Sequence, residues 1–312
     1  MTAPPRQAAV VLGTRASALA RTQTDAVAAL LAAVRPGLRC ETKVISTAGD
    51  RTQASGLPLP EIGGKGLFTA ELERALREGV IDIAVHSLKD LPTEDAENVV
   101  VGAVSAREDV RDCLVAHDGG TLAELPDGAV VGTSSLRRGA QLRALRPDLD
   151  VRSIRGNVDT RIAKVRAGEY DATVLAAAGI RRLGLEHEVA EWLEEETMLP
   201  APGQGALAVQ CRADDHVTLE LLREVDEPEA RAETTAERAF LATLGAGCAA
   251  PVAARAVTTA TPRVRLQGLV ASVDGGDMVR VEGEGDCAAI GEKLALDALA
   301  RGADRILAAI RG

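Results

Sequence analysis

The chain has 312 residues, of which 46% are hydrophobic and 1% aromatic, and its formal net charge at pH 7 is -10. This length suits two or three domains, and their cores must be built from aliphatic side chains. The scarcity of stacking rings and the negative charge argue against a protein that binds nucleic acid over a general surface.

Strand-like and helix-like segments alternate through the first part of the chain. The apolar run over 8–12 predicts a buried strand, and the pattern over 17–34 predicts a helix. We expect a second strand over 40–46, an amphipathic helix over 67–78 and a third strand over 81–85. This alternation is typical of an α/β unit with mainly parallel strands.

A comparable series begins near residue 109. Val130-Val131 and 151–154 each predict a strand that leads into a helix, and 172–176 predicts another strand. The segments 79–85 and 168–174 resemble each other, as do 13–17 and 132–137. We therefore expect two similar lobes, with a ligand cleft between them.

The last third of the chain has a different pattern. The segment 200–205, rich in Pro and Gly, predicts a crossing or hinge between the lobes. A helix beyond 228 leads to a cysteine loop, and short strands over 264–269 and 278–282 precede a closing helix from about 288. This order indicates a small α+β domain.

Cys248 lies among small residues, between Gly245 and Pro251. A thiol with so little shielding suits a nucleophile or a covalent anchor. An isolated cysteine is more often a small buried hydrophobe, and the local sequence leaves both interpretations open. The five cysteines and four histidines are scattered, which predicts a reducing compartment and no metal site. We find neither an N-terminal secretory signal nor a membrane-spanning apolar run, so we expect a cytoplasmic protein.

Basic residues concentrate between Gly132 and Arg166, a stretch with nine basic and three acidic side chains. This local excess in an acidic protein predicts an anion pocket, because hydroxyls and backbone N–H groups at helix starts, followed by arginines, favour carboxylates or phosphates. We expect the basic residues on outer helix faces to be solvated or paired: Arg143, Arg146, Lys164 and Arg166. The candidates for anion binding are Arg15, Arg137, Arg138, Arg155 and Arg161.

The segment His86-Ser87-Leu88-Lys89-Asp90-Leu91-Pro92 follows a predicted strand. The carboxyl ends of strands line the active crevice in α/β folds. Asp90 could therefore move protons or stabilise a cation, and Lys89 could bind an anion. An ordinary surface turn explains these residues equally well.

Together these segments resemble the porphobilinogen deaminases, also called hydroxymethylbilane synthases, over nearly the whole chain. The matching segments, in chain order, are 13–17, 63–68, 84–92, 132–138, 155–161, 202–206 and the loop around Cys248. The resemblance implies two periplasmic-binding-protein-like α/β lobes with mixed, mainly parallel sheets, plus a small α+β C-terminal domain. The expected parts are a first lobe of residues 1–106 and 206–224, a second lobe of residues 107–205 and a C-terminal domain of residues 225–312.

Members of this family join four porphobilinogen molecules head to tail into the linear tetrapyrrole hydroxymethylbilane and release ammonia at each step. The resemblance implies that the primer is a dipyrromethane cofactor attached through a thioether to Cys248. Each pyrrole carries an acetate and a propionate, so the growing chain needs many arginines. A tether also raises the effective concentration at the reacting centre by orders of magnitude.

The resemblance also implies roles for single residues. Asp90 would be the catalytic carboxylate, which helps the amine to leave and stabilises positive charge on the pyrrole ring. The cofactor carboxylates would be held by Lys89, Thr133, Ser135, Arg137, Arg138 and Arg161. The incoming substrate would be held by Arg15, Ser17, Arg155, Arg182 and Gln204. The implied working state is a cytoplasmic monomer that passes its product to the next tetrapyrrole enzyme, without a metal, nucleic acid or membrane.

Some positions depart from the family pattern, and other functions compete. Glu61 stands where many members have lysine, so we assign it no anion contact. The segment 50–62 is rich in Gly, Pro and small polar residues and is a candidate lid. A non-catalytic two-lobe binding protein for an organic polyanion is the main alternative, and a cysteine-nucleophile hydrolase or transferase is the second.

Overall fold

The computed structural model describes residues 9–47, 69–94, 96–246, 250–260 and 262–311. Cys248, Glu61, the candidate lid over 50–62 and the matching segment 63–68 lie outside the described residues. The chain divides into two compact units. The first unit comprises residues 1–107 and 206–231, and the second comprises residues 108–205 and 232–312.

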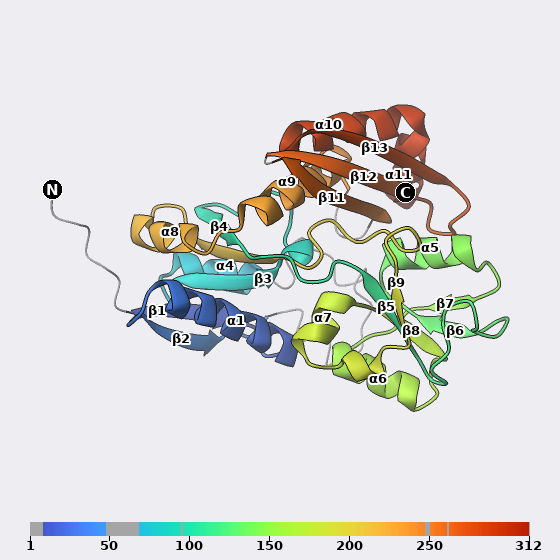
Figure 1. The fold of residues 1–312 in the computed structure, drawn as a ribbon, viewed down its shortest axis with the longest axis horizontal. Coiled ribbons are helices and arrows are strands. Elements are labelled where there is room, and N and C mark those ends of the chain that lie inside the picture. The colour runs from blue at the N-terminus through green and yellow to red at the C-terminus, as the bar shows by residue number, and fades with distance from the viewer. Residues whose placement is uncertain (1–8, 48–68, 95, 247–249, 261, 312) are drawn as a thin grey trace. The chain divides into compact units, whose positions relative to one another are not determined.

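The first unit is built on a five-stranded sheet in the order β2-β1-β3-β10-β4 (Figure 1). The pairs β1–β2 and β1–β3 are parallel, whereas β10 runs antiparallel to both of its neighbours. Four of the five strands therefore share one direction, as expected for a mixed, mainly parallel sheet. Its strands are β1 (Ala9–Thr14), β2 (Arg39–Val44), β3 (Ile83–Ser87), β4 (Val99–Val104) and β10 (Leu207–Arg212), and its helices include α1 (Ala18–Val34), α4 (Ala70–Arg77) and α8 (His216–Arg223).

The second unit contains another five-stranded sheet, in the order β7-β6-β8-β5-β9. Here β6 pairs in parallel with β7 and β8, and β5 runs antiparallel to β8 and β9. The strands are β5 (Asp112–Ala116), β6 (Val130–Gly132), β7 (Asp150–Arg152), β8 (Ala172–Ala176) and β9 (Glu191–Leu193). The helices α5 (Leu136–Leu145), α6 (Val158–Arg166) and α7 (Ala177–Arg182) belong to this lobe.

The two sheets share one topology, with three parallel strands, one reversed strand and an outer strand. The repeated aspartate of the sequence makes the same contacts in both. Asp82 accepts a hydrogen bond from the Val11 amide at 3.0 Å, and Asp171 accepts one from the Val130 amide at 2.6 Å. In return, the amides of Asp82 and Asp171 donate to the carbonyls of Val11 and Val130. The expected two-lobe α/β fold is confirmed, and its repeat is structural.

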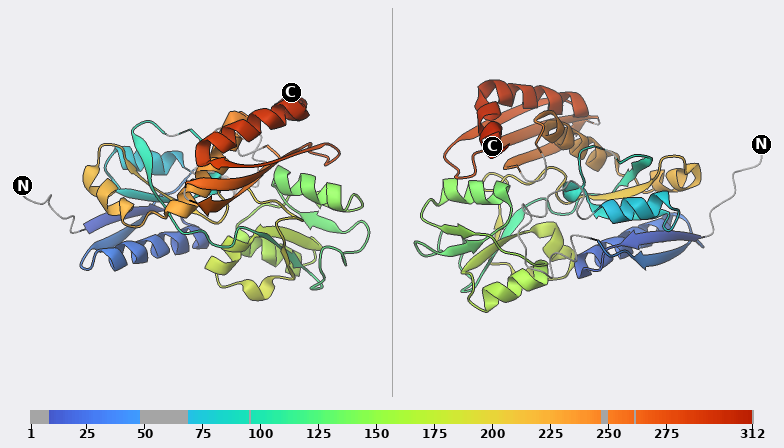
Figure 2. Two further views of the ribbon diagram at one scale, coloured as in Figure 1. Left: turned by 45° about the horizontal axis from the view of Figure 1, so that its top comes forward. Right: turned by 180° about the vertical axis from the view of Figure 1, so that it is seen from behind.

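A three-stranded antiparallel sheet follows, in the order β11-β12-β13, and α10 and α11 lie over one of its faces (Figure 2). Its core is aliphatic except for Phe240, which is fully buried. This is the small α+β part that the sequence predicts. Its elements are α9 (Pro228–Thr243), β11 (Val252–Ala260), β12 (Arg263–Ala271), β13 (Met278–Asp286), α10 (Cys287–Ala298) and α11 (Asp304–Arg311).

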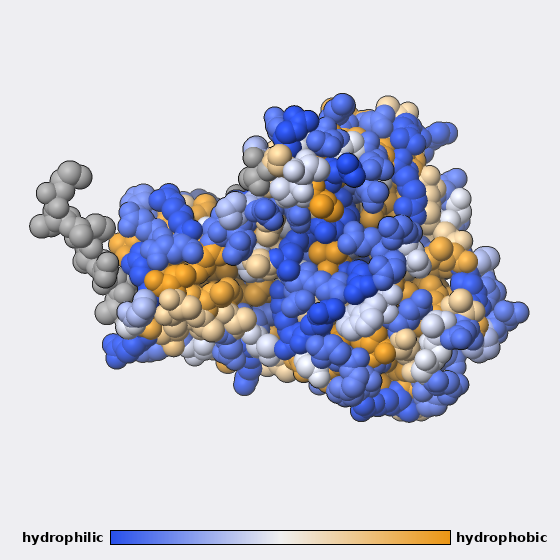
Figure 3. All heavy atoms as spheres, in the orientation of Figure 1, coloured by the Kyte–Doolittle hydropathy of each residue, from blue (hydrophilic) through white to orange (hydrophobic). Residues whose placement is uncertain are grey.

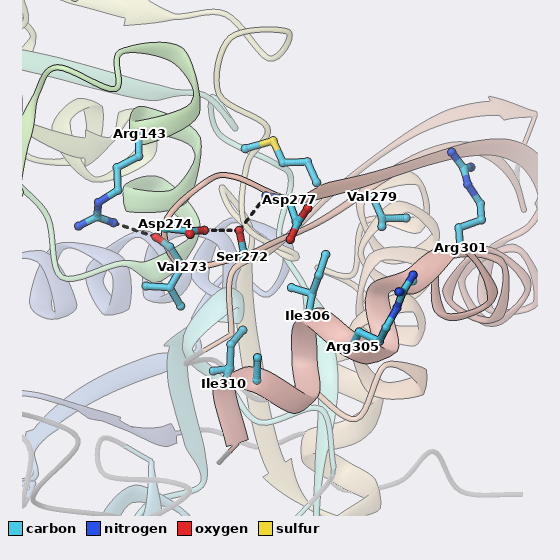
Figure 4. A pocket seen from close by; sticks show the side chains of 13 residues that line it. Arg143, Ser272, Val273, Asp274, Asp277, Val279, Arg301, Arg305, Ile306 and Ile310 are labelled. Carbon is cyan, nitrogen blue, oxygen red and sulfur yellow. Dashed lines mark hydrogen bonds between the residues drawn. The ribbon is translucent and has the colours of Figure 1, made fainter.

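The turn between β12 and β13 packs against α5 inside the second unit. Gly275 has a φ of +78°, and a side chain there would collide with the Ala140 carbonyl. Arg143 of α5 donates from Nη1 to the carbonyl of Val273 in the turn, at 3.0 Å (Figure 4). The helix and the small sheet therefore meet through backbone contacts that a glycine permits.

Hydrophilic side chains cover much of the face seen in Figure 3, although exposed apolar side chains also occur. Large hydrophobic side chains that are partly exposed include Leu30, Val44, Leu145 and Val257. Among the described helices, none combines the length and the apolar character needed to cross a membrane.

Candidate functional site

In the first unit, four predicted site residues follow strands that are neighbours in the sheet. Arg15 and Ser17 come after β1, and Lys89 and Asp90 lie in a single 3-10 turn, Leu88–Asp90, after β3. Because β1 and β3 pair in parallel, their carboxyl ends share one edge of the sheet. Asp90 is exposed and Lys89 is half-buried. This edge therefore presents a solvent-accessible carboxylate beside cationic groups.

Hydrogen bonds fix the backbone around this edge. Ser17 is the N-cap of α1, and its hydroxyl accepts from the Ala20 amide at 3.3 Å. Gln23 of α1 donates from Nε2 to the Ser87 hydroxyl at 2.8 Å, which ties the helix to the end of β3. The Ser17 hydroxyl thus has a capping role in addition to the substrate contact predicted for it.

His86 lies directly before this edge and is buried. Burial lowers the pKa of its imidazole to about 4, and the nearby positive charge of Arg15 acts in the same direction. The ring is therefore neutral at physiological pH and belongs to the core of the lobe.

In the second unit, the hydroxyl groups before α5 form hydrogen bonds with other groups of the protein. Ser135 is the N-cap of α5 and accepts from the Arg138 amide at 3.5 Å. Thr133 accepts from the Ser135 amide at 3.2 Å, and Ser134 donates to the Ile154 carbonyl at 2.6 Å. The loop between β6 and α5 is consequently held in one conformation, with its hydroxyls next to a helix N-terminus.

The two arginines that follow are buried, with exposed fractions of 5% for Arg137 and 6% for Arg138. Their Nη2 atoms donate to the two carboxylate oxygens of Asp112, at 2.8 Å from Arg137 and 2.7 Å from Arg138. Their Nη1 atoms donate to the carbonyls of Leu199 and Val174. The Nε atom of each arginine is buried and has no hydrogen-bond partner among the described residues. The pair thus retains unused donors next to a single compensating carboxylate.

Asp112 is fully buried and was not singled out from the sequence. It begins β5, and its register partner is Ala176 at the end of β8, so it lies at the carboxyl edge of the parallel strands. The available signal was an acidic residue directly before the apolar run Cys113–Ala116. A charge at the end of a buried strand requires a partner of opposite sign, and the basic stretch supplies two.

Gln204 and Arg182 lie near the same edge of the second unit. Gln204 is fully buried, and its Nε2 donates to the Val110 carbonyl at 2.7 Å and to Asp112 at 2.9 Å. Arg182 of α7 donates from Nη2 to the Gly205 carbonyl at 2.7 Å. Burial lowers the pKa of the Arg182 guanidinium. The segment 200–205 is therefore bound tightly to this lobe.

Arg155 and Arg161 flank the start of α6. Arg155 is half-buried in the loop after β7, and Arg161 donates from Nε to the Gly156 carbonyl at 2.8 Å. Gly156 has a φ of +114°, so the turn that places both arginines depends on this glycine. Both residues follow β7, which pairs in parallel with β6, and Thr133 comes directly after β6.

The arginines assigned to outer helix faces have local partners. Arg146 pairs with Asp148 at 2.6 Å, Arg166 pairs with Glu188, and Arg143 donates to backbone carbonyls. The expectation is confirmed for Arg146 and Arg166, whereas Arg143 packs against the turn after β12 and is neither fully solvated nor, among the described residues, ion-paired. They therefore do not contribute to an anion pocket, and the linear count of basic residues overstates its charge.

A separate hollow of about 810 Å³ lies between α5, the turn after β12 and the C-terminal helices (Figure 4). Its lining includes Arg143, Asp274, Val279, Arg305 and Ile306. None of the predicted site residues lines it, so we do not assign it to the site. Among the described residues, no group of three or more His, Cys, Asp and Glu side chains could hold a metal ion.

These observations define the class of the protein. It has α/β lobes in which hydroxyls, amides and guanidinium groups gather at the carboxyl ends of parallel strands, as in α/β proteins that bind small organic anions.

The comparison with known proteins identifies the family. Residues 10–220 match the family model "Porphobilinogen deaminase, dipyromethane cofactor binding domain", and residues 231–300 match "Porphobilinogen deaminase, C-terminal domain". The chain is 49% identical to a porphobilinogen deaminase of Roseiflexus castenholzii over 96% of this chain and 98% of that protein. It is 47% identical to one of Deinococcus radiodurans, over 97% of this chain and 99% of that protein. The chain belongs to the porphobilinogen deaminase family, as the sequence motifs predict.

Proposed function

We propose that this chain is a hydroxymethylbilane synthase, which joins four porphobilinogen molecules on a dipyrromethane primer and releases ammonia at each addition. The family matches, which together reach from residue 10 to residue 300, carry this proposal. Relatives named porphobilinogen deaminase align over nearly their full length, so the whole catalytic unit is available for comparison.

The donor set of the second unit fits the carboxylates of a dipyrromethane. Arg137 and Arg138 are buried, and within the described part of the chain the Nε–H group of each has no partner. Ser135 lies at a helix N-terminus. Guanidinium groups bind carboxylates in a bidentate manner, and burial strengthens such contacts. We infer that Thr133, Ser135, Arg137, Arg138 and Arg161, together with Lys89 of the first unit, hold the acetate and propionate groups of the cofactor. When bound, this group supplies the ring carbon to which the first substrate is joined.

Asp90 is the proposed catalytic carboxylate. Each addition forms a carbon–carbon bond, expels ammonia from the aminomethyl group of porphobilinogen and removes a proton from the attacking ring carbon. An exposed carboxylate can reach the leaving amine, stabilise the positive charge that develops on the substrate ring and accept the released proton. Arg15, Ser17, Arg155, Arg182 and Gln204 are the proposed contacts for the incoming substrate.

Cys248 is the proposed attachment point of the primer. A thioether keeps the growing chain on the protein, which turns each addition into an intramolecular reaction. Two of the other cysteines are unsuited to this role, because burial raises the pKa of Cys113 to about 12 and that of Cys211 to about 11. The separate aliphatic core of the β11–β13 part supports a third domain, so we propose the division into residues 1–106 with 206–224, 107–205 and 225–312.

Intact mass measurement of the purified protein tests this function. We expect an adduct of two linked pyrroles on the parent, no adduct on a Cys248→Ala variant, and discrete further increments when porphobilinogen is added. Cys287→Ala is the matched control, because Cys287 is a half-buried cysteine in the same part of the chain, and this variant should keep the adduct. A parent protein that stays at the bare polypeptide mass after incubation with porphobilinogen would favour the anion-binding alternative. A cytoplasmic monomer that passes its product to the next tetrapyrrole enzyme stays a prediction from the family.

A further inference from the structure

Asp112 is one carboxylate between two buried guanidinium groups. Its Oδ2 accepts from Arg137 at 2.8 Å, and its Oδ1 accepts from Arg138 at 2.7 Å and from Gln204 at 2.9 Å. We propose that Asp112 is a positioning residue that pre-organises Arg137 and Arg138 for the carboxylates of the dipyrromethane primer. This inference rests on the proposed function of the same site.

The hydrogen-bond pattern fixes the plane of each guanidinium. Arg137 is bonded through Nη1 to the Leu199 carbonyl and through Nη2 to Asp112. Arg138 is bonded through Nη1 to the Val174 carbonyl and through Nη2 to Asp112. Because both terminal nitrogens are bonded, neither guanidinium can rotate freely. The buried Nε–H group of each arginine has no hydrogen-bond partner among the described residues. The two long side chains therefore lose their conformational entropy when the protein folds, and binding of the primer need not immobilise them.

The charges favour the same role. Two adjacent guanidinium groups repel each other, and burial alone lowers the pKa of Arg137. Asp112 lies within hydrogen-bond distance of both guanidinium groups and offsets one of the two positive charges. The two arginines and Asp112 together carry one net positive charge, which is buried. A carboxylate of the primer would neutralise this charge.

Asp112 also connects the arginine pair to the strand that follows the cysteine loop. Gln204, which it binds, belongs to the segment 200–205, and the Gly203 amide donates to the buried carboxylate of Glu237 at 2.7 Å. The other oxygen of Glu237 accepts from the Ala256 amide of β11 at 2.8 Å. These contacts relate the two guanidinium groups to β11 through a continuous set of buried hydrogen bonds.

The rate of primer loading tests the proposal. Unprimed protein, produced in a host that makes no porphobilinogen, is incubated with porphobilinogen, and the adduct is followed by intact mass. We expect Asp112→Asn to load at least tenfold more slowly than the parent. The control is Asp215→Asn, which removes a carboxylate paired with Arg212 at 2.7 Å in the first unit, and which should lower the Tm but load like the parent.

The outcomes separate the inference from the function. If the parent and Asp215→Asn gain the adduct while Asp112→Asn loads at their rate, the positioning role is wrong and the proposed function stands. If the parent gains no adduct, the proposed function itself fails. Should Asp112→Asn not unfold cooperatively, Asp112→Glu takes its place, because it keeps the charge and displaces the carboxylate by one methylene.

A double-mutant cycle with Arg138→Gln distinguishes positioning from a general loss of stability. If Asp112 acts through the arginines, Asp112→Asn should slow loading less in the Arg138→Gln background than in the parent. Independent, multiplicative effects of the two substitutions would overturn the proposal.

Discussion

The two α/β lobes share a topology but place different chemistry at the carboxyl ends of their strands. In the first lobe, the edge carries Arg15, Lys89 and the exposed Asp90, with His86 kept neutral beneath it. In the second lobe, Arg137 and Arg138 are buried around Asp112. One edge presents an exposed carboxylate, and the other is a preformed set of buried donors.

This difference matches the two tasks that we propose for the repeated scaffold. The repeat keeps the backbone contacts of Asp82 and Asp171, which maintain the sheets. The side chains after the strands can differ between the lobes, because hydrogen bonds between strands involve only the backbone. A holding site benefits from rigid, desolvated donors, whereas a reacting site needs a carboxylate that can reach a succession of substrates.

The largest effect is expected from Asp90→Asn. Loss of a carboxylate that assists proton transfer should lower kcat about 10²–10⁴-fold. The exposed position of Asp90 predicts little change in Tm. Steady-state kinetics on the primed protein measure the effect, with the exposed Glu97→Gln as the control. A variant that keeps more than about a tenth of the parent kcat would remove Asp90 from its catalytic role.

Replacing an arginine should lower the free energy of unfolding more in the second lobe than in the first. In a Cys248→Ala background, which removes any effect of bound primer, Arg138→Leu should lower the free energy of unfolding by about 3 kcal/mol, because it breaks a buried pair. Arg15→Leu should cost less than about 1 kcal/mol, since Arg15 is only half-buried. Urea unfolding measures both, and equal losses would contradict the contrast between the two edges.

The buried imidazole of the first lobe predicts a pH dependence of stability. The pKa of His86 falls from 6.5 to about 4 on folding. Between these pH values the imidazole is protonated in the unfolded chain and neutral in the folded chain. Stability should therefore fall by about 3 kcal/mol as the pH drops from 6.5 to 4, and be unaffected by this group above 7. His86→Gln should flatten this part of the profile. Identical profiles for the parent and His86→Gln would exclude this cause.

The smallest expected effect compares the repeated aspartates directly. Asp82→Ala should cost about 2 kcal/mol, because Asp82 also pairs with Arg212 at 3.1 Å. Asp171→Ala should cost about 1 kcal/mol, since its hydrogen bond to Val130 is exposed. Thermal unfolding of the two variants checks the order, and the reverse order would show that the repeat is maintained differently in the two lobes.

Much of the fold was accessible from the sequence because the parallel strands are apolar runs followed by capped helices. The strand over 172–176 was predicted with the bounds it has, and Ser17 ends up as the N-cap that its position before α1 indicates. The reversed strands β5 and β10 were missed. Each pairs with strands far away in the sequence, so local periodicity does not reveal its place in the sheet.

The site was predictable at the level of residue types and less so at the level of partners. The arginines at the strand ends were identified, but Asp112 was not, because its pairing with Arg137 and Arg138 spans separate elements. The basic stretch is also less positive in space than in sequence, since Arg166 pairs with Glu188 from beyond it. Such neutralisation depends on tertiary contacts, which composition cannot show.

The placement of β10 has a consequence for folding during synthesis on the ribosome. β10 is inserted between β3 and β4, which are synthesised long before it. At about 5–20 residues per second, the first lobe waits roughly 5–20 s for the strand that completes its sheet, while the whole second lobe emerges. During that interval the facing edges of β3 and β4 lack their partner, and open strand edges of this kind are sites of wrong strand pairing.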